Sequence, residues 1–337
     1  MNIIVLAGGY SPERDVSLTS GSLIANALME EGHRVLLLDV YEGLREIPVA
    51  PLTLFRTTQR YHYQVTESIP DLDALKARCG NGDALIGPNV IELCRLADKV
   101  FLALHGAMGE NGQLQATLDS FGIPYTGSGY LGSALAMNKD LAKRLFLHAG
   151  IPTPDWVCLR PNGKEDLQAL PLPCVVKPCS CGSSVGISMA DTAEELKAAL
   201  AEAARWEDTV LVEQKITGRE FTVGILDGQA LPLVEIIPDE GFYDYRNKYQ
   251  GTTREICPAE LSPEDTQRAQ SLALAVFDAL HLRGYARVDI LMDGEGDLWV
   301  LEANTLPGMT PTSLLPQAAA AVGISYNQLC QRIIDLA

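Results

Sequence analysis

The 337-residue sequence lacks the features that mark membrane, secreted or nucleic-acid-binding proteins. No apolar stretch approaches the roughly 18 residues that a membrane-spanning helix needs. The N-terminal residues, MNIIVLAGG, have no basic segment and are typical of a buried first strand, not of a signal peptide. The net charge of −17 argues against a nucleic-acid or anionic-membrane surface. We therefore expect a cytoplasmic protein with small-molecule partners, no nucleic acid and no membrane.

Metal-binding and disulfide patterns are also missing. The eight cysteines are scattered, no CxxC occurs, and Cys179 and Cys181 are the only close pair. The five histidines include no HExxH spacing. This usage indicates reduced thiols rather than a zinc site or a disulfide framework. Aromatic residues make up only 6%, while the 47% hydrophobic content is ordinary for a soluble α/β protein of two or three domains.

Strands and helices alternate in the first third of the chain. Strands that are joined through helices pair in parallel, so we expect an open parallel sheet in a domain of about 125 residues. Residues 41–98 are less regular. The predicted elements are strands over 2–7, 33–40 and 99–106, helices over 17–32, 89–97 and 112–122, and a hairpin around 55–65.

Strands dominate the rest of the chain. The segment FYDYRNKYQG interrupts them with aromatic and charged residues of low apolar periodicity. The predicted elements are helices over 133–150, 192–206 and 262–282, strands over 172–178, 209–216, 219–228 and 229–238, and a final hairpin, RVDILMDGEGDLWVLEAN.

Polar groups gather at one end of that hairpin. Arg287 and Asp289 share one strand face, and so do Glu302 and Asn304. A loop over 294–297 sets Asp289 opposite Glu302, with Cβ atoms roughly 5 Å apart. Two carboxylates at that separation repel by roughly 3 kcal/mol at an effective dielectric near 20. A divalent cation such as Mg²⁺ relieves the repulsion, although a solvated hairpin end is the alternative.

A glycine- and serine-rich loop follows the strand that carries Lys177. In VVKPCSCGSSVGIS the glycines let backbone N–H groups approach an anion, and the lysine supplies a point charge for phosphate. The order is not that of a Walker A loop, and an ordinary hairpin turn is the alternative. Glu213 and Glu220 flank a strand exit where they could bind ribose hydroxyls or simply face solvent. Lys139, in AMNKD, could bind a ligand or could lie on a solvated helix face.

Two further segments each allow either an ordinary structural interpretation or a functional one. Glu13 stands at a helix N-terminus, where it could complement the helix dipole or receive an ammonium group. In LEANTLPGMTPTS, the Gly308 amide and the Ser313 hydroxyl could face a substrate carboxylate, or the segment could be an ordinary loop.

Taken together and in this order, these stretches resemble the ATP-grasp superfamily and, within it, the D-alanine–D-alanine ligases. The matching segments include GGYSPERDVS, ALHGAMGENG, VKPCSCGSSVG, FYDYRNKY and LEANTLPGMTPTS, and they extend from Gly8 to Ser313. The resemblance implies a three-domain α/β protein with an N-terminal Rossmann-like open parallel sheet and two α+β domains that sandwich ATP. It places the domains at 1–125, 126–214 and 215–337, with a mobile lid near 240–251.

The resemblance also implies a reaction and its participants. The first D-alanine is phosphorylated by ATP to an acyl phosphate, and the amine of the second then displaces phosphate, giving D-alanyl-D-alanine for peptidoglycan synthesis. Two Mg²⁺ ions are implied, with Mn²⁺ as a substitute, and so is a homodimer. A D-alanine–D-serine ligase is the alternative. A degenerate nucleotide sensor and a dinucleotide oxidoreductase are disfavoured, since the ligand positions are filled and LAGGYSPE is not GxGxxG.

The site residues carried over by motif fall into four groups. The metal ligands are Asp289, Glu302 and Asn304. The ATP-binding residues are Lys139, Lys177, Glu213, Lys215, Ile216, Glu220 and Lys248. The substrate-binding residues are Glu13, His105, Arg287, Gly308 and Ser313. The residues with catalytic roles are Glu13, Ser183, Arg287, Tyr249 and Gly308.

Some positions depart from the family pattern or bear on substrate choice. Tyr249 in the lid favours an amine as second substrate over a hydroxy acid. Cys181 stands where an acidic residue is frequent, and Asn138 stands where Asp is usual before the lysine.

Overall fold

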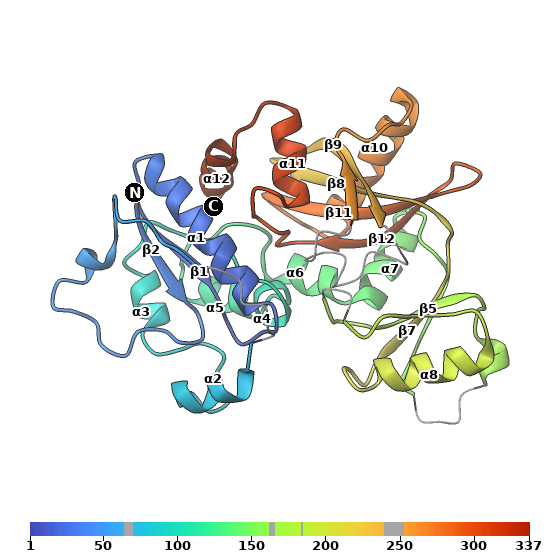
Figure 1. Cartoon of the computed structure of the whole chain (residues 1–337), viewed down its shortest axis with the longest axis horizontal. Coiled ribbons are helices and arrows are strands. Elements are labelled where there is room, and N and C mark those ends of the chain that lie inside the picture. The colour runs from blue at the N-terminus through green and yellow to red at the C-terminus, as the bar shows by residue number, and fades with distance from the viewer. Residues whose placement is uncertain (64–69, 162–165, 183–184, 239–252) are drawn as a thin grey trace.

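The computed structural model describes residues 1–63, 70–161, 166–182, 185–238 and 253–337. In this part of the chain the strands form three sheets, which lie in the left, lower-right and upper-right parts of Figure 1. None of the helices in the same residues is long and apolar enough to cross a membrane.

The N-terminal sheet is parallel, as predicted, and its strand order is β2-β1-β3. Its central strand is almost wholly buried because helix α1 packs against it and the flanking strands supply its hydrogen bonds. The strands are β1 (Asn2–Ala7), β2 (Arg34–Asp39) and β3 (Lys99–Leu102). The helices of this region are α1 (Arg14–Glu30), η1 (Pro51–Leu54), α2 (Leu72–Cys79), α3 (Val90–Cys94), α4 (Ala107–Glu110) and α5 (Gln113–Ser120).

The predicted hairpin around 55–65 is wrong for the residues that the structure describes. Arg56 makes only an isolated antiparallel bridge to Val35. Tyr61 is held instead by the Asn26 side chain of α1, which exchanges two hydrogen bonds of 2.9 Å with the Tyr61 backbone. A helix side chain therefore satisfies the backbone groups that a partner strand would have paired.

The central sheet is antiparallel, in the order β4-β7-β5-β6. Helix α8 covers one face, and its Thr192–Glu195 capping box fixes where it begins. The elements are β4 (Trp156–Leu159), η2 (Leu167–Ala169), β5 (Cys174–Pro178), β6 (Ser188–Ala190), α8 (Ala193–Ala203) and β7 (Val210–Gln214).

The C-terminal sheet is antiparallel, in the order β10-β9-β8-β11-β12. Its strands are β8 (Gly218–Leu226), β9 (Gln229–Pro238), β10 (Thr253–Ile256), β11 (Tyr285–Asp293) and β12 (Leu298–Asn304). Its helices are α10 (Pro263–Ala279), α11 (Leu314–Ala321) and α12 (Tyr326–Asp335). Helix α12 returns to the N-terminal sheet, where it packs on α1 and β3 (Figure 1).

The predicted single helix over 133–150 is two helices. Helix α6 (Tyr130–Met137) ends before Asn138, and α7 (Lys139–His148) begins after it. Asn138 has an extended backbone, and its side chain accepts a 3.0 Å hydrogen bond from the Leu141 amide. Periodicity alone missed this break because an internal N-cap leaves the apolar spacing intact.

Candidate active site

The residue pairs at the polar end of the β11–β12 hairpin are those predicted, but the turn between the strands differs from the predicted one. Arg287 lies opposite Asn304, and Asp289 lies opposite Glu302. The predicted four-residue loop is wrong, since the Asp293 amide donates to the Asp297 carbonyl at 3.0 Å and shortens the turn. A β-bulge at Leu301 restores the register.

The bulge also decides which side chains face the cavities. Val300 is buried in the core, whereas its neighbours Leu301 and Glu302 both line the larger of two cavities. Regular alternation would send these two to opposite faces of the strand. The bulge therefore places an apolar and an acidic side chain together on the open face.

Each carboxylate of this hairpin has its own cation. Arg287 donates two hydrogen bonds to Asp289, from Nε at 2.9 Å and from a terminal nitrogen at 3.0 Å. Thr222 on β8 donates a third, at 2.6 Å. Lys139 Nζ lies 3.3 Å from a Glu302 carboxylate oxygen. Burial alone lowers the pKa of Lys139, but Glu302 outweighs it and leaves that pKa above its ordinary value.

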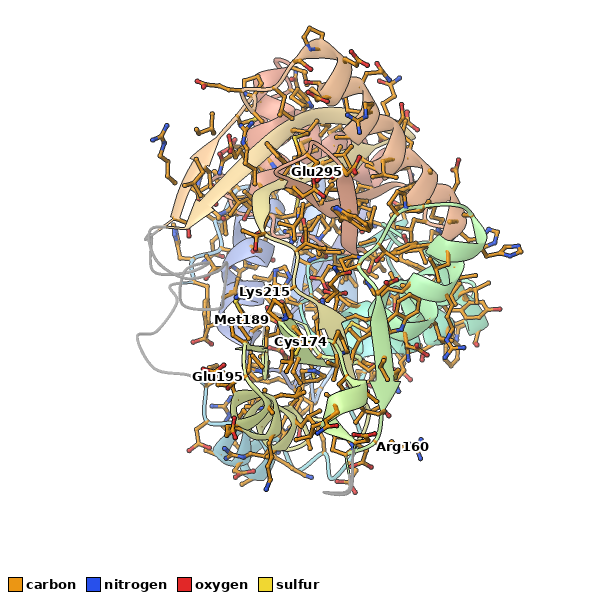
Figure 2. The ribbon with its side chains drawn as sticks, turned by 90° about the vertical axis from the view of Figure 1, so that its right-hand side faces the viewer. Arg160, Cys174, Met189, Glu195, Lys215 and Glu295 are labelled. Atoms are coloured by element: carbon orange, nitrogen blue, oxygen red, sulfur yellow. The ribbon has the colours of Figure 1, made fainter. Side chains whose placement is uncertain are left out.

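A larger cavity of about 610 Å³ lies between the central and C-terminal sheets. Figure 2 labels Lys215, which follows β7, and Met189 of β6, and both residues line this cavity. The lining residues that the sequence had singled out are Lys177, Glu213, Lys215, Ile216, Glu220, Asp289 and Glu302. These residues, separated by up to 125 positions in the chain, are thus brought to one space.

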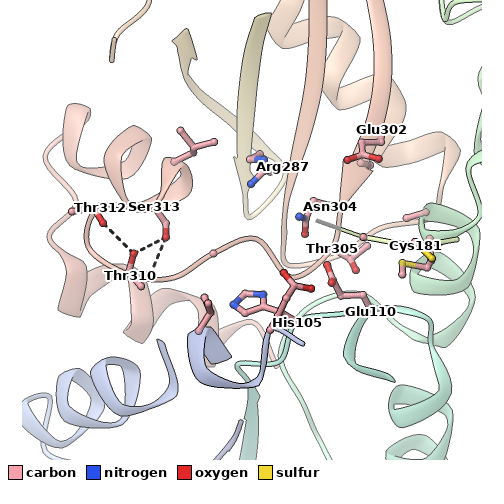
Figure 3. A pocket seen from close by; sticks show the side chains of 18 of the residues that line it. His105, Glu110, Cys181, Arg287, Glu302, Asn304, Thr305, Thr310, Thr312 and Ser313 are labelled. Carbon is pink, nitrogen blue, oxygen red and sulfur yellow. Dashed lines mark hydrogen bonds between the residues drawn. The ribbon is translucent and has the colours of Figure 1, made fainter. Parts of the chain in front are cut away.

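A smaller cavity of about 370 Å³ opens on the other side of the hairpin end (Figure 3). Its lining residues that the sequence had singled out are Glu13, His105, Lys139, Cys181, Arg287, Glu302, Asn304, Gly308 and Ser313. Glu302 lines both cavities, so the two spaces meet at the hairpin end.

Two lysines hold one carboxylate at the wall of the larger cavity. Lys177 Nζ lies 2.8 Å from Glu213 Oε1, and Lys143 Nζ lies 2.6 Å from Glu213 Oε2. Burial raises the pKa of Glu213, but the two lysines together bring it below its ordinary value. Burial also lowers the pKa of Lys143 to about 8, in spite of its carboxylate partner.

The floor of the smaller cavity gathers acidic groups around His105. Gly106 has φ +82°, and a Cβ there would lie 2.7 Å from the Ser11 hydroxyl, so only glycine fits this turn. The Gly106 amide donates to Glu110 at 2.7 Å. Burial, followed by the Glu13 carboxylate, raises the pKa of Glu110 to about 8. The Glu110 carboxyl therefore largely keeps its proton at neutral pH.

His105 Nε2 is a buried polar atom beside this acidic pair. It has no hydrogen-bond partner within the described residues. Burial lowers the pKa of His105, against the opposing effect of Glu13. A neutral imidazole that lines the smaller cavity can therefore offer a donor or an acceptor to a ligand.

The far wall of the smaller cavity is a small hydroxyl network. Ser313 begins helix α11, yet its side chain makes no capping hydrogen bond. Its hydroxyl lies 2.8 Å from the Thr310 hydroxyl and accepts from the Thr310 amide at 3.1 Å, as Figure 3 shows. Gly308 lies against it, since a Cβ at Gly308 would be 2.8 Å from Ser313 Oγ. Such groups suit a carboxylate ligand.

Three residues named from the sequence, Ser183, Lys248 and Tyr249, lie outside the described residues. The structure adds four that sequence reasoning missed: Lys143, Glu110, Thr222 and Thr310. Lys143 carried a signal, since it follows Lys139 by one helical turn on the same face. Glu110 carried none, because its importance arises from its neighbour Glu13, almost a hundred residues earlier in the chain.

The donor set at the hairpin end suits a hard divalent cation. Asp289, Glu302 and Asn304 offer only oxygen ligands, which Mg²⁺ prefers, on one face of paired strands. Within the described part of the chain no three His, Cys, Asp or Glu side chains converge as a metal site by themselves. Two carboxylates and an amide require further oxygens from outside the protein, which is typical of Mg²⁺ bound together with phosphates.

The sheets, the two joined cavities and the oxygen-rich hairpin end define an ATP-grasp enzyme. The family profile described as "D-ala D-ala ligase N-terminus" matches residues 2–128, and "D-ala D-ala ligase C-terminus" matches residues 145–335. The chain therefore belongs to the D-alanine–D-alanine ligase family, as the sequence resemblance indicated.

Known relatives match over nearly the full chain. The D-alanine–D-alanine ligase of Pediococcus pentosaceus is 42% identical and that of Lacticaseibacillus casei is 40% identical, each over 99% of this chain and over 97% and 95% of the relative. The crystal structure of the Bacillus anthracis D-alanine–D-alanine ligase complexed with ATP has a TM-score of 0.76 and 32% identity, covering 100% of this chain and 97% of that one. That likeness supports the predicted ATP-grasp fold.

Proposed function

We propose that this protein joins two D-alanine molecules into D-alanyl-D-alanine and converts ATP to ADP and phosphate. The observation that carries the proposal is the meeting of the two cavities at Glu302, beside the Arg287–Asp289 pair. A triphosphate in the larger cavity and an amino acid in the smaller one would bring their reacting groups to that point. Family membership and the ATP complex of the Bacillus anthracis relative support the same assignment.

The larger cavity would hold the nucleotide. Lys177, with Lys139 from across the hairpin, would contact the phosphates. The strand exit at Glu213, with the backbone of Lys215 and Ile216, would frame the adenine ring, and Glu220 would bind the ribose hydroxyls. The Glu213 carboxylate is already engaged by two lysines, so its backbone is the part that is available to the base.

Asp289, Glu302 and Asn304 would hold two Mg²⁺ ions, or Mn²⁺ in their place. When bound, these ions supply positive charge against the phosphate oxygens. In their absence Arg287 and Lys139 neutralise the two carboxylates.

The smaller cavity would hold both amino acids. Glu13 would receive the ammonium group of the first D-alanine, with His105 nearby. The Ser313 hydroxyl would bind the carboxylate of the second. Arg287 and the Gly308 amide would stabilise the negative charge that develops at the reacting carbonyl, and such preorganised donors are often the largest contribution to catalysis.

The reaction would proceed in two displacements. The carboxylate of the first D-alanine attacks the γ-phosphorus, ADP leaves, and an acyl phosphate forms. The amine of the second D-alanine, having lost a proton, attacks the acyl carbon, and inorganic phosphate leaves as the peptide bond forms. The roles predicted for Lys248 and Tyr249 in a water-excluding lid, and for Ser183 as a residue against which Tyr249 closes, stay predictions, since these residues lie outside the described ranges.

The test is phosphate release from ATP with D-alanine alone, compared with D-alanine plus D-serine or D-lactate. We expect release with D-alanine alone and no marked stimulation by either competitor. Absence of release with D-alanine alone would refute the proposal, and strong stimulation by D-serine would favour the alternative ligase. The relatives described above are all D-alanine enzymes, so no observation favours D-serine.

We also propose that the protein is a homodimer, on the strength of its family resemblance. Size-exclusion chromatography coupled to light scattering should then give about twice the chain mass of 36.4 kDa. A mass of one chain would contradict it.

A further inference from the structure

Lys143 lies behind the wall of the larger cavity and does not line it. Its side chain is completely buried, with 0% exposure, on the same face of helix α7 as Lys139. A fully buried lysine is rare unless it is paired, so its partners show what it does.

Each partner of Lys143 orients it toward Glu213. Its ammonium group donates to the Thr153 hydroxyl, which in turn donates to the Val300 carbonyl at 2.8 Å. The same group lies 5.2 Å from the centre of the Trp156 ring. Trp156 is paired with Glu213 across the β4–β7 ladder, so the ring, the ammonium and the carboxylate lie together.

Glu213 links Lys143 to the cavity. The Glu213 side chain is 3% exposed, and each of its two oxygens lies beside a different lysine. Lys177 is the member that lines the larger cavity. These direct ion pairs hold two positive charges and one negative charge, so the three-residue cluster keeps a net positive charge beside the space assigned to phosphates.

We propose that Lys143 is a positioning residue that shares the Glu213 carboxylate, so that Lys177 keeps its place and enough positive charge for the nucleotide phosphates. This inference rests on the proposed function, because it requires a phosphorylated ligand in the larger cavity. Without Lys143, Glu213 and Lys177 form a neutral one-to-one pair, and the whole charge of the carboxylate then acts on the ammonium of Lys177, which already lies 2.8 Å from it. The nucleotide then loses its electrostatic partner although no cavity-lining residue has changed.

The test compares ligands with and without phosphates. Lys143→Met keeps an unbranched side chain and removes the charge. By calorimetric titration with Mg²⁺ present, we expect AMP-PNP to bind roughly tenfold or more weakly, the size of a lost charge-assisted interaction, with adenosine binding unchanged. The matched control is Lys76→Met, which removes an equal charge from an exposed helix that lines neither cavity.

A second change tests charge sharing directly. Adding Glu213→Gln to Lys143→Met removes the surplus carboxylate, so AMP-PNP affinity should recover to within about threefold of wild type. Steady-state kinetics should show the same pattern, with the KM for ATP raised in the single variant and kcat and the KM for D-alanine little changed. If Lys143→Met does not fold, Lys143→Gln makes the same charge change and retains a donor for Glu213.

Four results would overturn the inference. Equal weakening of adenosine and AMP-PNP would show a merely structural role, and unchanged AMP-PNP affinity would show no role. A folded double variant without recovery would refute charge sharing. Wild-type protein that binds AMP-PNP no more tightly than adenosine would also count against it. These titrations require no ligation, so failure of phosphate release with D-alanine would refute the proposed reaction separately.

Discussion

Asp289 on β11 lies directly opposite Glu302 on β12, and each carboxylate is held by a different cation, Arg287 or Lys139. The pair lies where the two cavities meet, because Asp289 lines the larger cavity and Glu302 lines both. Two acids at this separation are costly unless positive charge surrounds them. That cost explains why the polar hairpin end belongs to the candidate active site and not to a solvated turn.

We expect Asp289→Ala and Glu302→Ala to lower ligase turnover by roughly a hundredfold or more, since each removes an oxygen ligand from the predicted metal site. Phosphate release at saturating ATP and D-alanine measures this, and circular dichroism should report an unchanged fold. Glu295→Ala, at the exposed turn of the same hairpin, is the control and should retain activity. Full activity in either cavity variant would show that the hairpin end binds no required metal.

The Glu110 carboxyl should make stability depend on pH. Its pKa is raised to about 8 in the folded protein from an ordinary 4.5, so between these values the folded chain holds a proton that the unfolded chain has lost. Stability should therefore fall as pH rises through this window, by an amount on the order of a few kcal/mol. The Glu110→Gln variant should lose less stability as the pH rises.

The measurement is the midpoint of thermal unfolding at pH 5 and pH 8. Wild type should lose more stability between the two than Glu110→Gln does, and the exposed-site control Glu295→Gln should behave as wild type. Parallel pH profiles for wild type and Glu110→Gln would contradict the prediction.

Ser313→Ala should weaken binding of the second D-alanine. The Ser313 hydroxyl is free of any capping role and lies in a network with Thr310 at the wall of the smaller cavity. Loss of one hydrogen bond to a charged carboxylate costs about 1.5–3 kcal/mol, so the KM for D-alanine should rise roughly tenfold or more. The KM for ATP should not change.

Ser325→Ala is the matched control for that change. Ser325 caps helix α12 with a capping box, outside both cavities, so its loss should cost about 1 kcal/mol of stability and leave both KM values alone. An unchanged KM for D-alanine in Ser313→Ala would remove this hydroxyl from the substrate site.

Asn138 should tolerate aspartate but not alanine. Its side chain caps α7 through the Leu141 amide, and Asp caps a helix N-terminus equally well. We expect Asn138→Asp to be neutral within about 0.5 kcal/mol and Asn138→Ala to cost about 1 kcal/mol in denaturant unfolding. A larger cost for Asp than for Ala would contradict the prediction, because Asp keeps an acceptor both for the Leu141 amide and for the Cys179 thiol, whose hydrogen bond to Asn138 is 3.4 Å.

Prediction from the sequence succeeded where local pattern and chemistry agreed. The parallel pairing in the N-terminal sheet followed from strands that alternate with helices, whereas the order β2-β1-β3 came from the structure. The pairing of Asp289 with Glu302 was confirmed although the loop was wrong, because the bulge at Leu301 offsets the shorter turn. The prediction of a hairpin failed over residues 55–63, where a side chain of α1 satisfies the backbone groups that were expected to pair with a strand.

By itself, the amino-acid sequence determined the chemistry of the protein: acidic, amide, lysine and glycine residues in the order of an ATP-grasp ligase. Only the tertiary structure decided how those groups are charged and shared. The Lys143–Glu213–Lys177 cluster and the Glu13–Glu110 pair join residues from separate elements. The pKa values of Lys143, Glu213 and Glu110 depend on burial and on neighbours distant in the chain. Packing sets both, and the spacing of residues along one strand or helix does not contain that information.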